Sequence, residues 1–238
     1  MIFILLLCLA FLALGSGLTM LWMQQTPVEI PQISNQPMDY EAMEDTAEEE
    51  IDFFILEGIP ETAAPSNSED AVGELYVSDA RREYQSGSMR LVIPKLEINE
   101  GILDGVSGKK LAAGDGLYPY AQLPTEENGN VSIAGHRNGT RNGRPVASRK
   151  FYYLNTLTEG DYLYLIYNGT VYQYLWECTE VILPDNWDPI RNRGYGCITL
   201  TTCTPIGVAD HRLVVRGALV ASYPESPEAT LPISRPPY

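Results

Sequence analysis

Basic residues are missing from the first third of this chain. All 16 Lys and Arg residues lie beyond residue 80, whereas about half of the 31 Asp and Glu residues lie within residues 1–80. The formal net charge of −15 therefore belongs to the N-terminal part, and residues 81–238 are close to neutral. Nucleic-acid binding depends on a basic surface that neutralises phosphates, so this charge pattern argues against a nucleic-acid partner.

Several ligand-binding motifs are also absent. The sequence has only two His and four Cys residues, and they form no zinc-type cluster. It has neither a phosphate-binding glycine loop nor the glycine pattern of a dinucleotide-binding fold, so we expect no cofactor. Cys178, Cys197 and Cys203 follow residue 80, and an odd number leaves at least one thiol outside any disulfide within the domain. A Cys178–Cys197 disulfide is an alternative that an exported compartment permits.

The N-terminus contains a long apolar stretch. Residues 2–23 carry no charged side chain and are almost all apolar, and about 20 such residues are enough for a helix to span a bilayer. A cleavable signal peptide would need a basic start and a small-residue cleavage site, and neither is evident. We therefore expect an uncleaved transmembrane anchor over residues 1–24, with the downstream domain outside the cell.

An acidic segment separates this anchor from the rest of the chain. Residues 25–87 are rich in Glu, Asp, Pro, Ser and Gln, and low hydrophobicity with charge of one sign is typical of a disordered, self-repelling stalk. Residues 51–56 (Ile-Asp-Phe-Phe-Ile-Leu) interrupt it. Two interpretations stay open for them, a chance apolar cluster or a short element that docks over the groove of the folded domain.

Residues 88–222 have the pattern of an all-β domain. The 15 Tyr residues and the frequent Val, Ile and Thr residues favour strands, and Asn168-Gly169 between two apolar runs predicts a type I′ hairpin turn. Pro94 interrupts an early strand, which places that strand at an edge or at a bulge. Short strands with turns between them suggest a closed barrel or a sandwich. We expect strands over residues 90–98, 130–134, 162–167, 171–183, 197–203 and 212–220, one helical turn within 108–116, and a Pro-rich tail over 223–238.

Two residues at predicted strand ends have the chemistry of thiol-based acyl transfer. His136 follows the strand over residues 130–134, and Cys203 ends a strand before a turn-forming Thr-Pro-Ile-Gly sequence. A His within reach of a thiol can take its proton or form an ion pair with the thiolate. Acyl transfer also needs a donor for the oxyanion, and Arg212 would lie beside Cys203 if the chain returns after the turn. By themselves, a single Cys and a single His in a β domain are more often packing residues.

A longer match gives these residues a context. The segment from Thr199 to Gly217 reads Thr-Leu-Thr-Thr-Cys-Thr-Pro-Ile-Gly-Val-Ala-Asp-His-Arg-Leu-Val-Val-Arg-Gly. It resembles the signature of the sortase family, in which a TLxTC strand is followed by a strand that bears an arginine. The Ala-Gly-His-Arg sequence around His136 is similar to the histidine motif of that family. The resemblance covers about residues 89–222.

The resemblance implies an eight-stranded sortase-type β-barrel with short helices and a cysteine transpeptidase activity. Cys203 would attack the Thr–Gly-type bond of an LPxTG-like sorting signal on a secreted protein and form a thioester. An amine of peptidoglycan or of a pilin would then take the acyl group. His136 would transfer protons and Arg212 would stabilise the oxyanion, with Arg216 as the competing arginine. Substrate contacts are expected at Thr202, Thr204, Ala134 and Trp187.

The subclass stays open between two patterns. The segment from Cys203 to Gly217 is similar to pilin-polymerising class C sortases, which usually have a C-terminal membrane helix and an Asp-Pro-aromatic lid motif before the domain. Here Trp187-Asp188-Pro189 lies just before the catalytic strand instead, and the chain ends in a Pro-rich tail. The N-terminal anchor and the Ile-Ala-Gly-His-Arg sequence are more similar to housekeeping or class D/E sortases. The loop over residues 184–196 would then flank the substrate groove.

Some assignments have alternatives. Glu126 and Glu127 could lie near a calcium site, as in some sortases, or in a solvated loop. Asp210 could orient His136. The activity could instead be that of another exported Cys/His cell-wall peptidase or of an L,D-transpeptidase, although the usual Cys environments of those enzymes are not visible here. A non-catalytic barrel that binds sorting signals or scaffolds a pilus is a further alternative, against which the intact Cys, His and Arg residues argue.

Overall fold

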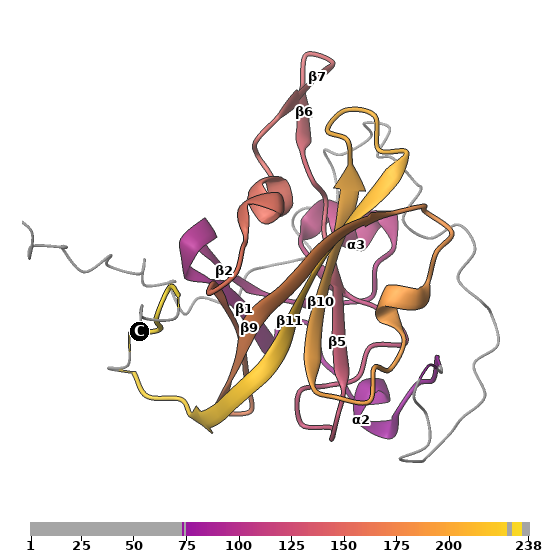
Figure 1. Cartoon of the computed structure of the whole chain (residues 1–238). Helices are drawn as coiled ribbons and strands as arrows, with labels where there is room; N and C mark the ends of the chain where they lie inside the picture. Colours follow the sequence, from indigo (N-terminus) through magenta and orange to yellow (C-terminus); the bar gives the residue numbers. More distant parts are fainter. Residues whose placement is uncertain (1–72, 74, 228–229, 235–238) are drawn as a thin grey trace, which may run out of the picture. The chain divides into compact units, whose positions relative to one another are not determined.

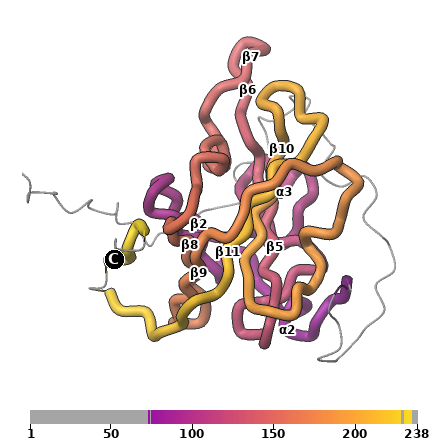
Figure 2. The backbone as a smooth tube through the Cα atoms, in the orientation of Figure 1, coloured from indigo at the N-terminus to yellow at the C-terminus, as the bar shows by residue number. Residues whose placement is uncertain are grey.

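The part of the chain that the structure describes folds into a β-rich domain with few and short helices (Figures 1 and 2). The computed structural model describes residues 73, 75–227 and 230–234. The expected anchor, the apolar residues 51–56 and most of the expected stalk lie outside these residues. Within them, no helix is both long and apolar enough to cross a membrane. The prediction of an all-β domain is confirmed.

The main sheet has nine strands in the spatial order β2-β1-β8-β9-β11-β10-β5-β4-β3. In chain order these are β1 (Met89–Ile93), β2 (Ile98–Gly101), β3 (Leu103–Asp104), β4 (Gly116–Leu117), β5 (Asn130–Ala134), β8 (Tyr162–Tyr167), β9 (Thr170–Ile182), β10 (Cys197–Thr204) and β11 (His211–Pro224). A separate hairpin consists of β6 (Gly139–Arg141) and β7 (Arg144–Val146). Within the described residues, the helical elements are α2 (Asp79–Arg82), α3 (Gly108–Ala113) and the 3₁₀ helices η2 (Pro94–Leu96), η3 (Lys150–Thr156) and η4 (Asp188–Ile190).

The two ends of this strand order meet, which closes the sheet into a barrel. β2 and β3 lie at opposite ends of the order, yet only Ile102 separates them in the chain. The Ile102 N–H donates to the Met89 carbonyl at 2.8 Å, and the Leu103 N–H donates to the Asp115 carbonyl at 2.9 Å. One stretch of chain therefore bonds to both edges. The sheet has nine strands where the resemblance implied eight, and β3 and β4 have only two residues each.

Most of the predicted strands are present, and one needs correction. β5 and β8 have the predicted bounds, and the φ angles of 50° at Asn168 and 70° at Gly169 are those of the predicted type I′ turn. The strand expected over residues 90–98 instead ends at Ile93, and Pro94 begins η2. β1 is not an edge strand, because it pairs with both β2 and β8. Pro94 is tolerated there because it follows the last paired residue and needs no ladder hydrogen bond.

The folded domain is longer at both ends than the predicted range of residues 88–222. Leu75 and Tyr84 belong to the hydrophobic core, and buried Arg81 on α2 donates from Nε to the Tyr118 carbonyl at 2.9 Å. At the other end Leu231 is buried, and the Tyr164 hydroxyl donates to the Pro232 carbonyl at 2.7 Å. Residues 75–87 and 230–234 are therefore part of the domain and not of the stalk or tail. The composition of these segments did not indicate that they belong to the domain, because their few buried side chains lie among many polar ones.

β10 is the strand that carries the predicted nucleophile, and it is buried almost throughout. It pairs with β11 on one side and with β5 on the other, and every residue from Cys197 to Cys203 is buried. Ile198 and Leu200 contribute to the hydrophobic core. A strand bonded on both sides has little freedom to move, so residues at its C-terminal end have a rigid support.

Candidate active site

Cys203 and Arg212 lie directly opposite each other on neighbouring strands. β10 and β11 are antiparallel, and their register pairs Cys203 with Arg212 and Thr204 with His211. Residues in such positions project to the same face of the sheet, with Cβ atoms roughly 5 Å apart. The expectation that the chain returns after the turn and brings Arg212 beside Cys203 is confirmed.

The Arg212 guanidinium is held by the loop that joins the two strands. Its Nη1 donates to the carbonyls of Ala209 and His211, each at 3.0 Å. Arg212 is 3% exposed and Cys203 is 8% exposed. A donor that is fixed and largely shielded from water can stabilise a developing negative charge without reorganising.

His136 is brought to the same end of the sheet by the parallel pairing of β5 and β10. Just after β5, the Gly135 N–H donates to the Thr201 carbonyl at 3.1 Å. The Thr202 hydroxyl donates to the Gly135 carbonyl at 2.7 Å. These two bonds fasten the residue before His136 to the residues before Cys203. His136 itself is half-buried.

Gly135 is required at this position by its close neighbours. A Cβ atom there would collide with Oδ1 of Asp115 and would lie 2.8 Å from Cδ2 of Phe151. Asp115 precedes β4 and is buried, and its Oδ2 has no hydrogen-bond partner among the described residues. A side chain on residue 135 would therefore push the backbone that carries His136 out of place.

Asp115 is a buried acid with an unusual titration. Burial, and to a lesser degree the charge of Glu100, raise the pKa of Asp115, while Arg149 and Lys150 lower it, and the net result is a pKa of about 8. At neutral pH the carboxyl is therefore mostly protonated and uncharged. Sequence analysis missed this residue, because a single Asp in a loop carries no signal of its own.

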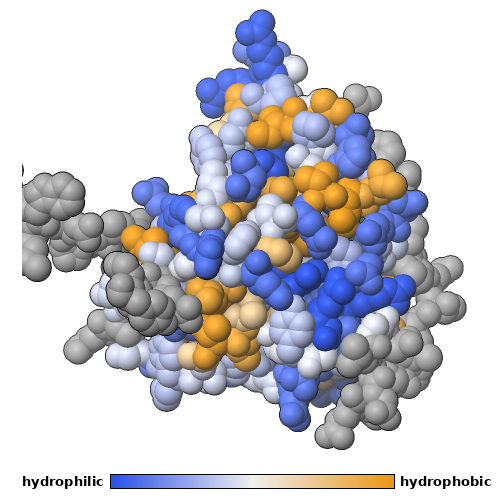
Figure 3. Space-filling model, in the orientation of Figure 1, coloured by the Kyte–Doolittle hydropathy of each residue, from blue (hydrophilic) through white to orange (hydrophobic). Residues whose placement is uncertain are grey.

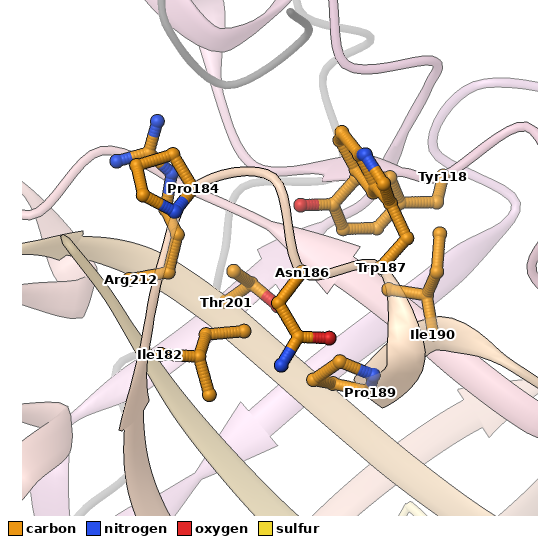
Figure 4. Close-up of a pocket in the computed structure, with 9 residues that line it drawn as sticks. All are labelled: Tyr118, Ile182, Pro184, Asn186, Trp187, Pro189, Ile190, Thr201 and Arg212. Atoms are coloured by element: carbon orange, nitrogen blue, oxygen red, sulfur yellow. The ribbon is translucent and has the colours of Figure 1, made fainter. Parts of the chain in front are cut away.

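A cleft opens beside Arg212 on the outer face of the sheet, beneath the segment that joins β9 to β10 (Figure 4). Figure 4 shows Arg212 on one side of the cleft and Tyr118 with Trp187 on the other. The rings of Tyr118 and Trp187 meet edge to face, with centroids 6.2 Å apart. The lining residues are Tyr118, Ile182, Pro184, Asn186, Trp187, Pro189, Ile190, Thr201 and Arg212.

Asn130 anchors the segment over residues 184–196 against the barrel. Its Nδ2 donates to the carbonyls of Pro189 and Arg191, each at 2.8 Å, and its Oδ1 accepts from the Thr199 hydroxyl at 2.8 Å. The segment that was expected to flank the groove thus supplies one wall of the cleft and is fixed at its base.

Tyr118 and Arg137 belong to the site, although sequence analysis did not select them. Burial raises the pKa of the Tyr118 hydroxyl, while the nearby charge of Arg212 lowers it and Cys203 raises it. Burial also lowers the pKa of Arg137, against the effects of Tyr152 and Cys203. Both side chains therefore lie within electrostatic reach of the thiol. Arg137 stands in the histidine motif, whereas nothing distinguishes Tyr118 from the other tyrosines.

The four residues expected to contact substrate differ in position. Trp187 lines the cleft, and Thr204 is half-buried beside Cys203. Ala134 is fully buried, and the Thr202 hydroxyl is bound to the backbone before His136. Their role as substrate contacts stays a prediction. Thr202 and Ala134 are buried, so their side chains support the backbone that carries the candidate site.

Two alternatives for charged residues are not supported by the geometry. Arg216 lies opposite Thr199, four positions away from Arg212, and its Nη2 lies 3.4 Å from the Glu180 carboxylate. The arginine opposite the thiol is thus Arg212. Asp210 lies 2.8 Å from Nδ1 of His211, so it pairs with its neighbour rather than orienting His136.

The alternative of a Cys178–Cys197 disulfide does not agree with the structure. Both thiols are free, and β11 runs between the strands that carry them. The strands of the two cysteines are thus two strand spacings of about 4.8 Å apart. This separation exceeds the roughly 7 Å between Cα atoms over which a disulfide can form.

The calcium alternative at Glu126 and Glu127 gains no support. Oε2 of Glu126 accepts from the Leu123 N–H at 2.5 Å and so closes a local turn. In the part of the chain that the structure describes, no group of three or more His, Cys, Asp or Glu residues could hold a metal ion.

Comparison with known proteins assigns the family. A protein-family model described as the sortase domain matches residues 91–220, more than half of the chain. The chain belongs to the sortase family. It is 32% identical over 178 residues to sortase SrtE1 of Streptomyces coelicolor, covering 68% of this chain and 49% of that protein. It is 29% identical over 133 residues to sortase A of Bacillus anthracis, covering 56% of this chain and 60% of that protein. The chain thus spans about half to three fifths of the length of these relatives.

Solved sortase structures share the fold. Sortase E1 of Streptomyces coelicolor, crystallised with a tripeptide in its active site, gives a TM-score of 0.52 at 29% identity and covers 62% of this chain and 98% of that one. Sortase C of Streptococcus pneumoniae gives a TM-score of 0.54 at 26% identity, covering 69% of this sortase and 83% of that chain. Sortase C-1 of Actinomyces oris gives a TM-score of 0.52 at 30% identity and covers 58% of this chain and 76% of that one. Both subclasses considered from the sequence are therefore represented among the similar structures.

Proposed function

We propose that this sortase is a cysteine transpeptidase that cleaves an LPxTG-like sorting signal and transfers the acyl part to an amine. The observation that carries the proposal is the cross-strand pair of Cys203 and Arg212. It stands at the end of a buried strand to which the backbone before His136 is fastened. Membership of the sortase family supports the same chemistry.

The first half-reaction makes a thioester. Cys203 gives its proton to His136, and the sulfur attacks the carbonyl carbon of the scissile Thr–Gly-type bond. The carbonyl oxygen takes the negative charge of the tetrahedral intermediate beside the fixed Arg212 guanidinium. When the intermediate collapses, the C–N bond breaks and protonated His136 gives its proton to the departing amine.

The second half-reaction returns the thiol. An incoming amine attacks the thioester carbonyl and loses a proton to His136 as the new amide forms. The carbon–sulfur bond breaks, and the Cys203 sulfur recovers its proton from His136. Water in place of the amine would give hydrolysis by the same steps.

The partners and location follow from this activity. The acyl donor would be a secreted protein with a C-terminal sorting signal, and the acceptor would be an amine of the cell wall or of a pilin. The enzyme would be held in the cell membrane by a single span over residues 1–24, with the barrel outside the cell, and would need no cofactor.

The relative amounts of amine-linked and hydrolysed product test the proposal. A donor peptide with an LPxTG-like motif is incubated with the enzyme, with and without a glycine-based amine, and the products are identified by mass spectrometry. We expect amine-linked product whenever the amine is present. Hydrolysed product alone, at every amine concentration, would indicate a peptidase instead.

A further inference from the structure

The segment that follows His136 concentrates positive charge beside the active site. Residues 136–158 contain five basic residues and no Asp or Glu, in a chain with a net charge of −15. Three of the five have partners in the domain. Nε of Arg137 donates to the Tyr152 carbonyl at 2.8 Å, Nη1 of Arg149 donates to the Ala112 carbonyl at 2.9 Å, and Lys150 pairs with Glu100 at 3.2 Å.

Arg141 and Arg144 form the tip of the β6–β7 hairpin and have no such partner. They are paired directly across the turn, where Asn142 and Gly143 have φ angles of 52° and 70°. Both arginines are exposed, and neither forms an ion pair with another residue that the structure describes. Like charges directly opposite each other destabilise a strand pair. This arrangement suits an anionic group that comes from outside the domain.

The hairpin lies next to the loop that connects Cys203 to Arg212. A Cβ atom on Gly207 in that loop would lie 2.7 Å from Cγ of Pro145 on β7, so loop and hairpin are in contact. In Figure 1 the hairpin extends from the barrel at the end where β10 and β11 are joined, and α2 lies at the opposite end. Figure 3 shows a hydrophilic surface at this extension.

We propose that the β6–β7 hairpin is a docking site for an acidic stretch of the polypeptide that supplies the acyl group. This inference rests on the proposed transpeptidation. The acceptor amine is cationic when protonated, so Arg141 and Arg144 repel it, whereas carboxylates on the acyl donor are attracted. Guanidinium groups bind carboxylates through paired hydrogen bonds. Because both arginines are exposed, each contact is modest and is screened by salt, which suits capture of a substrate rather than tight binding.

The test measures binding and so does not depend on turnover. The full chain with Cys203→Ala is titrated into a fluorescent oligo-glutamate peptide and into a matched oligo-glutamine peptide. The same titration is made with Arg141→Gln/Arg144→Gln added. These substitutions remove the repulsion across the hairpin, so they should not unfold it. The control is Arg82→Gln/Arg90→Gln, which removes the same charge from α2 and β1.

We expect the parent to bind oligo-glutamate about fivefold more tightly than oligo-glutamine at low salt, as two exposed ion pairs would give. The preference should disappear at about 0.5 M salt, where charges are screened within a few ångströms. The hairpin variant should lose the preference and the control should keep it. An unchanged preference in the hairpin variant would overturn the inference, and so would an equal loss in the control. Tighter binding of a polyphosphate of matched charge would also overturn it, because the ligand would then be an anionic polymer.

Failure of the two proposals can be told apart. A chain that binds oligo-glutamate through the hairpin but never forms a thioester would refute the proposed activity and leave the docking site standing. An active enzyme whose KM for an acid-flanked donor is unaffected by Arg141→Gln/Arg144→Gln would refute the docking site alone.

Discussion

Arg212 shows how the surrounding backbone can hold one side chain ready for its proposed catalytic role. Its guanidinium donates to the carbonyls of Ala209, in the loop between β10 and β11, and of His211, at the start of β11, and its Cα is paired with that of Cys203, the proposed nucleophile. The loop thus fixes the donor relative to the thiol. Arg216, on the same strand, is engaged with Glu180 and faces a different part of the sheet.

Substitution of these two arginines should separate their roles. Arg212→Ala is expected to lower the rate of thioester formation by about 10²–10³, the usual effect of removing an oxyanion donor. The rate of thioester formation by Arg216→Ala should stay within a few-fold of the rate of the parent. Single-turnover kinetics with a donor peptide measure both, and thermal unfolding shows that each variant is folded. A nearly normal rate for Arg212→Ala would assign the oxyanion to other donors.

Asp115 gives the protein a predictable pH dependence of stability. Its pKa is raised from 3.8 to about 8, so the folded state holds a proton that the unfolded chain releases. The stabilisation is complete below the unfolded pKa and is lost progressively as the pH rises to about 8. Asp115→Asn cannot ionise and should lose less stability over this range.

Melting temperatures of the parent and of Asp115→Asn, measured from about pH 5 to about pH 8, test this prediction, because a shifted pKa makes the free energy of unfolding depend on pH. The difference between Asp115→Asn and the parent should grow with pH in favour of the variant. Asp185→Asn, at an exposed position, should follow the parent. Parallel curves for the parent and Asp115→Asn would contradict the assigned titration.

At the scale of elements, the close packing of β4 against the end of β5 sets the position of His136. An added Cβ in Gly135→Ala would collide with Asp115 and press on Phe151. We expect a loss of about 1–3 kcal/mol in the free energy of unfolding, as for other overpacked sites. We also expect a larger loss of activity than this destabilisation alone would cause. Both are measured by denaturant unfolding and by the rate of thioester formation.

Two further variants make the Gly135 prediction specific. Gly114→Ala adds a Cβ that would lie 3.5 Å from Leu103 Cδ1, an ordinary contact, and should be close to neutral. Asp115→Ala removes the side chain that collides, so the double variant with Gly135→Ala should recover part of the lost activity. Strictly additive effects would show that the two residues do not interact.

Elements with a strong local pattern could be predicted from the sequence, and others could not. β5, β8 and the turn at Asn168 follow from apolar runs and a turn-forming dipeptide. β3 and β4 have two residues each and leave no periodic pattern. The β6–β7 hairpin has the same Asn-Gly signal at Asn142, but its strands are polar and short and were therefore missed.

The candidate active site was predictable to the extent that its residues belong to a linear motif. His136, Cys203 and Arg212 were selected because they lie in or beside such sequences, and the structure places them at the same end of the sheet. Tyr118 and Asp115 reach the site only through the pairing of β4 with β5, a tertiary contact between segments that look unremarkable in the sequence.

At the scale of the whole molecule, segments outside the predicted domain complete the barrel core. Leu75 and Tyr84 are buried before β1 begins. A chain that starts at residue 88 should therefore be less stable than one that starts at residue 73, since each large buried side chain contributes roughly 1.5–3 kcal/mol. Denaturant unfolding of the two chains measures the difference. Equal stability would mean that these residues only rest on the surface of the barrel.

The central claim is that Cys203 forms an acyl–enzyme with a sorting-signal peptide. The most direct measurement is intact-protein mass spectrometry after incubation with a panel of LPxTG-like peptides, with the modified residue located by fragmentation. We expect a mass increase equal to the acyl part of one peptide, located on Cys203, absent from Cys203→Ala and discharged when an amine is added. An adduct on Cys178 or Cys197, or no adduct with any peptide while Cys203 still reacts with a thiol probe, would contradict the account.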